Sequence, residues 1–150
     1  MLGDTCGRVM YGGDVGRVSE GSRELQLKVT PPMVGELERQ ADIMRAAWWR
    51  TSSKAAKSDA ALECLERGTS IVSRSETWPD DPALPSSPDI EPVHATEPLT
   101  LVVNERWLSW VEDIASQRRV SRASALRRLM LAGLIPNRRA LMRREDRAAS

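Results

Sequence analysis

The chain has 150 residues, enough for one ordinary domain or two very small ones, and its 41% apolar and 29% charged residues suit a soluble, mainly helical protein. No stretch approaches the ~20 consecutive apolar residues that cross a bilayer, and the N-terminus lacks the apolar run of a secretory signal, so we expect a cytoplasmic protein without membrane contacts. The net charge of +1 conceals a division: residues 98–150 carry eleven arginines against five acids, whereas residues 73–97 carry six acids and one arginine. This division indicates a polyanionic partner for the basic part, although a solvated arginine-rich helix face would have the same composition.

The composition divides the chain into five segments. Residues 1–23 are rich in glycine and have little apolar periodicity, which indicates a flexible N-terminal arm. Residues 24–72 and residues 98–135 show regular apolar patterns. The segment between them, residues 73–97, has five prolines among serines and acids, which is typical of an extended acidic linker. Residues 136–150 form a basic tail.

The first patterned segment predicts a strand and two helices. Apolar and polar residues alternate from Leu25 to Thr30, which is the period of a half-buried strand. A pair of prolines beginning at Pro31 suits the first turn of a helix. After a polar break at residues 50–53, small and apolar residues continue at helical spacing, and we expect this second helix to end at Gly68.

The second patterned segment repeats this order. Alternation from Leu99 to Asn104 predicts the strand, and Asn104 is a good N-cap for the helix that follows. Residues 118–121 break the apolar stripe of that helix, and Ser121 is the expected N-cap of the last helix. Gly133 near its end is a candidate stop.

The strand-helix-helix order, present twice, resembles the ribbon-helix-helix family, the Arc- and MetJ-type DNA-binding proteins whose two-stranded β-ribbon enters the major groove. In the second repeat the resemblance rests on residues 99–103, 120–124 and 131–134. The first repeat covers residues 25–71 and is longer between its strand and its glycine. Two copies in one chain strengthen the resemblance.

The resemblance implies a mainly α fold with a short two-stranded antiparallel β-ribbon. One strand with two short helices buries too little apolar surface to stay folded alone, so two such units must pair. A tandem pseudo-dimer within one chain is the arrangement that the two repeats suggest. The alternative is that like repeats of two chains associate, which would give two ribbons per dimer.

By resemblance, the outward side chains of the ribbon are the base-reading residues. In the major groove, glutamine can bond adenine, lysine can bond guanine, and valine can contact the thymine methyl group. A merely solvated sheet face would show the same alternation. Because the two strands differ, an internally paired ribbon should read two unlike half-sites. The residues so assigned are Gln26, Lys28, Thr30, Thr100, Val102 and Asn104.

The resemblance also assigns phosphate contacts to the beginning of each second helix. Unpaired backbone N–H groups and the positive end of the helix dipole lie there, and serines at these positions would cap the helix as well. The residues are Arg118, Arg119, Ser121 and Arg122 in the second repeat and Thr51, Ser52, Ser53 and Lys54 in the first.

Nothing in the sequence indicates an enzyme, a metal site or a cofactor. His94 is the single histidine, and with Cys6 and Cys64 it makes no metal-ligand spacing. The two cysteines form no disulfide framework, so we expect a reducing, intracellular setting. We expect Trp78 of the acidic linker to pack onto the folded core rather than to anchor a partner.

The function expected from these features is sequence-specific binding of double-stranded DNA, most simply as a transcriptional repressor. Three alternatives stay open. One is a conjugation (relaxosome) accessory protein, because tandem chains of this family occur in that role, and another is an antitoxin whose tail binds a toxin. The third is a protein-interaction module whose ribbon no longer reads bases, which the apolar Val102 favours. Besides DNA, the basic tail could bind a second copy of the chain or another protein.

Overall fold

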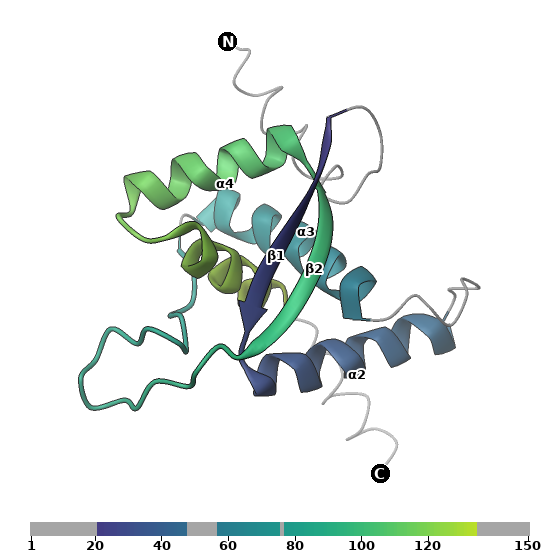
Figure 1. The fold of residues 1–150 in the computed structure, drawn as a ribbon, viewed down its shortest axis with the longest axis horizontal. Helices are drawn as coiled ribbons and strands as arrows, with labels where there is room; N and C mark the ends of the chain where they lie inside the picture. Colours follow the sequence, from purple (N-terminus) through teal and green to yellow (C-terminus); the bar gives the residue numbers. More distant parts are fainter. Residues whose placement is uncertain (1–20, 48–56, 76, 135–150) are drawn as a thin grey trace.

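The computed structural model describes residues 21–47, 57–75 and 77–134, so most of the N-terminal arm, the break at residues 50–53 and the basic tail lie outside the described part. This part of the chain is mainly helical and contains one two-stranded antiparallel sheet, which confirms the expected fold class in outline. In chain order the elements are β1 (Ser22–Val29), α2 (Pro31–Ala47), α3 (Lys57–Ser75), β2 (Glu97–Asn104), α4 (Glu105–Gln117) and a last helix over residues 122–134 (Figure 1).

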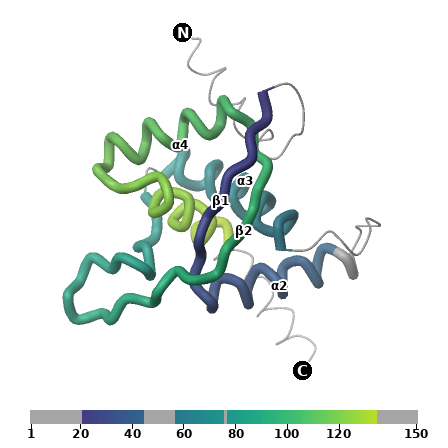
Figure 2. Tube along the Cα trace, viewed as in Figure 1, coloured from purple at the N-terminus to yellow at the C-terminus, as the bar shows by residue number. Residues whose placement is uncertain are grey.

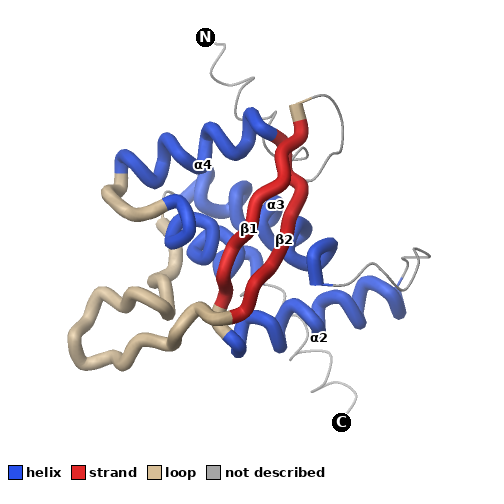
Figure 3. The backbone as a smooth tube through the Cα atoms, viewed as in Figure 1, coloured by secondary structure: helices blue, strands red, loops and turns tan. Residues whose placement is uncertain are grey.

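The two strands, distant in sequence, lie side by side as a ribbon (Figure 3). Gln26 pairs with Thr100 near its centre, and the ladder runs from Ser22 opposite Asn104 to Val29 opposite Glu97. The predicted alternation is confirmed, although both strands begin earlier than expected. One face of the ribbon is buried, through Leu25, Leu27, Val29, Leu99, Leu101 and Val103.

The helices lie against the buried face of the ribbon. Because α2 continues from the end of β1 and α4 from the end of β2, the two helices begin at opposite ends of the antiparallel pair (Figure 1). Between them, α3 and the last helix lie behind the ribbon in the view of Figure 2. The apolar core therefore occupies the space between one sheet face and four helices.

The two strand-and-helix segments bury residues at the same spacing. In each segment the last apolar residue of the strand is followed by three helical residues that recur every four positions, which is the repeat of one helix face. The buried residues are Val29, Met33, Leu37 and Ala41 in β1–α2 and Val103, Trp107, Val111 and Ala115 in β2–α4.

Each strand leads directly into a residue that caps the next helix, Thr30 just after β1 and Asn104 at the end of β2. The Thr30 hydroxyl accepts a hydrogen bond from the Met33 backbone N–H at 3.3 Å. The Asn104 side-chain oxygen accepts from the N–H groups of Arg106 and Trp107, at 2.8 and 3.2 Å. Both side chains thereby satisfy donors that the first turn of a helix leaves unpaired, so strand and helix join without an intervening loop.

Gly68 in α3 and Gly133 in the last helix lie where the two helices touch through their backbones. A Cβ atom at Gly68 would lie 1.8 Å from the Leu129 carbonyl oxygen, and one at Gly133 would lie 1.9 Å from the Cys64 carbonyl oxygen. The expectation that Gly68 ends its helix is wrong, because α3 continues to Ser75. The glycine is required for the close approach of the two backbones rather than for a helix end.

Replacing Gly133 with alanine should destabilise the fold, because the new methyl group would overlap a backbone oxygen that cannot rotate away. We expect the free energy of unfolding to fall by about 1–3 kcal/mol, the usual cost of overpacking. Urea unfolding measures this change.

Gly35→Ala is the matched control. Gly35 is exposed in α2, and a Cβ atom there meets nothing within 4 Å. Alanine at this position should stabilise the helix by about 0.5–1 kcal/mol. Equal stability of Gly133→Ala and the wild type would contradict the backbone contact between the two helices.

Candidate nucleic-acid interface

Six exposed residues alternate with the buried ones and form what we term the outer face of the ribbon. They meet as three cross-strand pairs. Each pair joins one residue of β1 to one of β2, and all six side chains are accessible to a partner. The pairs are Glu24 with Val102, Gln26 with Thr100, and Lys28 with Pro98.

Four of the residues assigned to base reading lie on this outer face: Gln26, Lys28, Thr100 and Val102. The expectation that Thr30 lies there is wrong, since Thr30 is 1% exposed and its hydroxyl caps α2. Asn104 is half-buried, and its side-chain oxygen caps α4. The alternation therefore stops facing outward at the last position of each predicted strand, because the side chain of that residue caps the next helix.

Glu24 and Pro98 belong to the outer face and are absent from the sequence-based assignment. Both precede the predicted strands, and the signal that would have found them is the same alternation continued one step upstream. Their inclusion changes the chemistry of the surface. Glu24 offsets the charge of Lys28, so the outer face carries no net charge and one of its two strands presents proline, threonine and valine.

At the beginning of the last helix, Ser121 is the expected N-cap. Its hydroxyl accepts from the Ser124 backbone N–H at 3.1 Å, and its carbonyl accepts from Ala125 at 2.9 Å. Arg122, the next residue, pairs with Glu112 of α4 at 3.1 Å, with both side chains more than 40% exposed. An exposed pair of this kind is weak and easily exchanged for a phosphate. The corresponding residues of the first repeat, Thr51 to Lys54, lie outside the described part.

Arg118 and Arg119 differ in surroundings. The Arg118 guanidinium lies 4.5 Å from the centre of the Trp78 ring, and that of Arg128 lies 5.2 Å from it. Trp78 packs against the core, which confirms that expectation. Arg119 is exposed and has a left-handed backbone with φ of 58°, at the turn that closes α4.

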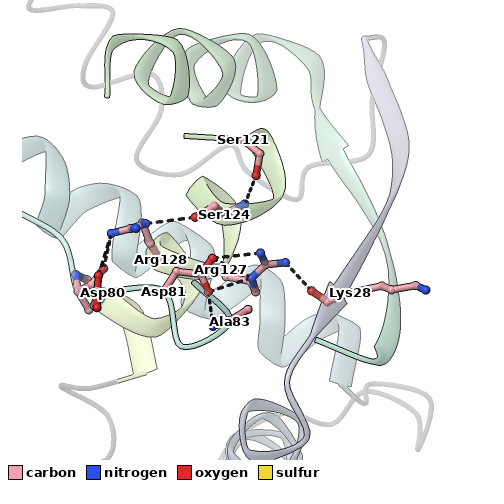
Figure 4. A network of polar contacts seen from close by, with 9 residues as sticks. Lys28, Asp80, Asp81, Ala83, Ser121, Ser124, Arg127 and Arg128 are labelled. Carbon is pink, nitrogen blue, oxygen red and sulfur yellow. Dashed lines mark hydrogen bonds and ion pairs between the residues drawn. The ribbon is translucent and has the colours of Figure 1, made fainter. Parts of the chain in front are cut away.

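The connecting loop, residues 77–96, docks on the last helix through its acidic residues (Figure 4). Arg127 donates from Nε and Nη2 to the Asp81 carboxylate at 3.0–3.2 Å, and from Nη1 to the Lys28 carbonyl at 3.1 Å. Arg128 lies 3.7 Å from an Asp80 oxygen. The structure therefore differs from the extended linker expected for residues 73–97. The helix α3 continues to Ser75, and the loop that follows is held by ion pairs that composition alone does not reveal.

Asp81 is fully buried, and Arg127 is 7% exposed. Burial raises the pKa of Asp81, but the hydrogen bonds from Arg127 and the Ala83 N–H outweigh it, so that the pKa lies below its ordinary value of 3.8. The carboxylate is therefore ionised at neutral pH. As a result, acidic residues of the connecting loop neutralise part of the positive charge of the last helix within the molecule.

Within residues 21–47, 57–75 and 77–134, no group of three or more histidine, cysteine or acidic side chains could hold a metal ion. Burial raises the pKa of the Cys64 thiol to about 12, so the thiol stays protonated at neutral pH. Among the helices of the same residues, none combines the length and apolar character of a membrane span. Comparison with protein families, curated proteins and solved structures finds no significant match to this chain.

Asn104 provides a test of the cap. Asn104→Ala should lower the free energy of unfolding by about 1 kcal/mol, because two N–H groups of α4 lose their acceptor. Asn104→Asp keeps an acceptor oxygen and should retain most of the stability. Both are measured by urea unfolding, and an alanine variant as stable as the aspartate variant would contradict the capping role.

The pH dependence of unfolding tests the buried pair. Because the pKa of Asp81 is lower in the folded chain than in the unfolded one, its stabilisation is complete above pH 3.8 and is lost as the pH falls through the folded-state pKa. Asp81→Asn should cost about 3–5 kcal/mol at neutral pH, since it leaves Arg127 buried without a counter-charge. The difference in the free energy of unfolding between the wild type and Asp81→Asn should shrink in acid. A constant difference at all pH values would contradict this account.

Proposed function

We propose that the chain binds double-stranded DNA by placing the outer face of the ribbon in the major groove, most simply as a transcriptional repressor. The observation that carries the proposal is the ribbon itself. Its outward side chains are accessible along both strands, while its other face is fully used by the core. A two-stranded ribbon fits the major groove, where base edges present a distinct pattern of donors and acceptors.

We further propose a tandem pseudo-dimer of two ribbon-helix-helix halves. One half consists of β1, α2 and α3, and the other consists of β2, α4 and the last helix. Three features support this. Gln26 pairs with Thr100 near the centre of the ribbon, and the buried residues of β1–α2 and β2–α4 have the same spacing. The glycine contacts are also reciprocal: each glycine meets the carbonyl of the residue one turn before the other glycine.

The base-reading roles follow from side-chain chemistry. Gln26 suits adenine, Lys28 suits the acceptors of guanine, and the exposed Val102 suits a thymine methyl group. Glu24, opposite Val102, can accept from the amino group of cytosine. Since β1 contributes three polar side chains and β2 contributes only Thr100, the proposed target is asymmetric rather than palindromic.

Both second helices touch the ribbon and would place helix ends beside the DNA backbone. Ser58, near the beginning of α3, donates to the Thr100 carbonyl at 3.1 Å. The last helix reaches β1 through Arg127 and begins at Ser121 and Arg122. N–H groups at such helix ends bind phosphate oxygens, which explains affinity without base selection.

A protein-interaction module is the second candidate, and one observation favours it. The outer face of the ribbon has no net charge and places Val102 beside Glu24, a combination that suits a protein surface at least as well as DNA. A role in conjugation or as an antitoxin would use the same DNA contact with a further protein partner, and the basic tail is the segment proposed for it.

Selection from a random library of double-stranded DNA, followed by binding measurements, tests the proposal. We expect one enriched, asymmetric sequence whose affinity falls steeply with salt. Lys28→Ala should weaken binding to that sequence by about 1–3 kcal/mol and relax the preference at one base pair. Arg74→Ala is the matched control, because it also removes one positive charge. Arg74 lies in the last turn of α3, whereas α3 contacts the ribbon near its beginning, through Ser58.

The two outcomes are distinct. Equal affinities of Lys28→Ala and Arg74→Ala for the selected sequence would remove Lys28 from the base-reading set. A library from which the wild type enriches nothing would overturn the DNA-binding proposal in favour of the interaction module.

A further inference from the structure

Arg127 connects three parts of the molecule that are far apart in sequence: the last helix, the connecting loop and β1. Its side chain bonds the Asp81 carboxylate through two nitrogens and the Lys28 carbonyl through the third. A guanidinium group is planar and rigid, so a two-point contact with a carboxylate fixes the direction of the remaining N–H groups. The position of Asp81 therefore determines where Arg127 aims its bond to the strand.

The bond from Arg127 reaches the ribbon at Lys28, near the end of β1. Lys28 is the second-last residue of β1, close to the end of the ladder between the strands. A two-stranded sheet is only marginally stable by itself and depends on contacts from outside the sheet. The Lys28 side chain lies on the outer face and points away from Arg127 in Figure 4, while its carbonyl points toward it. The bond thus holds the backbone of the residue whose side chain faces the partner.

In the other half of the described chain, the position that matches Arg127 carries no charge. Arg127 lies six residues before Gly133, and Leu62 lies six residues before Gly68. Leu62 has no charge and is partly buried against the core. On β2 the corresponding support is the exposed hydrogen bond from Ser58 to the Thr100 carbonyl. The charged support therefore serves the strand that carries both Gln26 and Lys28.

We infer that Asp81, acting through Arg127, is a positioning residue that fixes the Lys28 end of the ribbon, so that the connecting loop supports the proposed DNA-reading surface from behind and is more than a tether. This inference rests on the proposed function for its effect on base preference. Its effect on the strand holds in the absence of DNA. Because both side chains are buried, this support is protected from salt, unlike the exposed contacts to phosphate.

The test uses a double variant, Asp81→Leu with Arg127→Met. Loss of one partner alone could unfold the chain, whereas replacement of a buried ion pair by apolar side chains of similar volume usually preserves folding. The double variant removes the donor to the Lys28 carbonyl. Arg128→Met is the matched control, because Arg128 holds the same loop through Asp80 and the Pro79 carbonyl, and neither contact involves β1.

Two measurements are made on the full chain. In hydrogen exchange without DNA, the double variant should exchange about tenfold faster or more at residues 27–29 and at an unchanged rate at residues 22–24, while Arg128→Met should leave both rates unchanged. In DNA selection, the double variant should lose about tenfold in preference at the base pair that Lys28→Ala also affects. Its preference at the base pair read by Gln26 should persist.

Unchanged or uniformly faster exchange along β1 would overturn the positioning role. A double variant that selects the wild-type sequence with full preference at the Lys28 base pair would overturn the effect on reading. If neither the wild type nor Arg128→Met selects any sequence, the proposed function fails, and the exchange measurement alone decides whether Asp81 positions the strand.

Discussion

The backbone contact between α3 and the last helix is the constraint on which the structure depends. Neither half of the chain can bury its own apolar surface, since a strand and two helices offer too little of it. Gly68 and Gly133 allow the two helices to approach until backbone meets backbone, which any side chain would prevent. The ribbon then lies over the crossed helices, and its inward leucines and valines complete a single core.

This packing determines which side chains can meet a partner. Because the inward face of the ribbon packs in the core, only the residues of its outer face are exposed. The N-caps Thr30 and Asn104 mark where the outer face ends on each strand. The docked loop then neutralises Arg127 and Arg128 by Asp81 and Asp80. The DNA contact that we propose for the outer face of the ribbon therefore depends on shape and on a few polar contacts more than on a dense basic surface.

The sequence predicts the elements that depend on local patterns. The alternation at Leu25 and Leu99 and the N-caps Asn104 and Ser121 are confirmed. Contacts between distant segments were not predictable in this way. The bond from Arg127 to Asp81 joins residues 46 positions apart, and composition alone described that segment as a linker. On β1 the predicted outer face included Thr30 and missed Glu24, because a threonine in sequence fits a strand and a helix cap equally well.

The central claim is that the outer face of the ribbon contacts DNA. Backbone amide NMR of the full chain, with and without a selected duplex, tests it most directly because it needs no substitution. The account predicts the largest shifts at residues 24–28 and 99–102, with smaller ones at the beginnings of α3 and the last helix. Shifts confined to the connecting loop or to α2 and α4, with the ribbon unchanged, would contradict it.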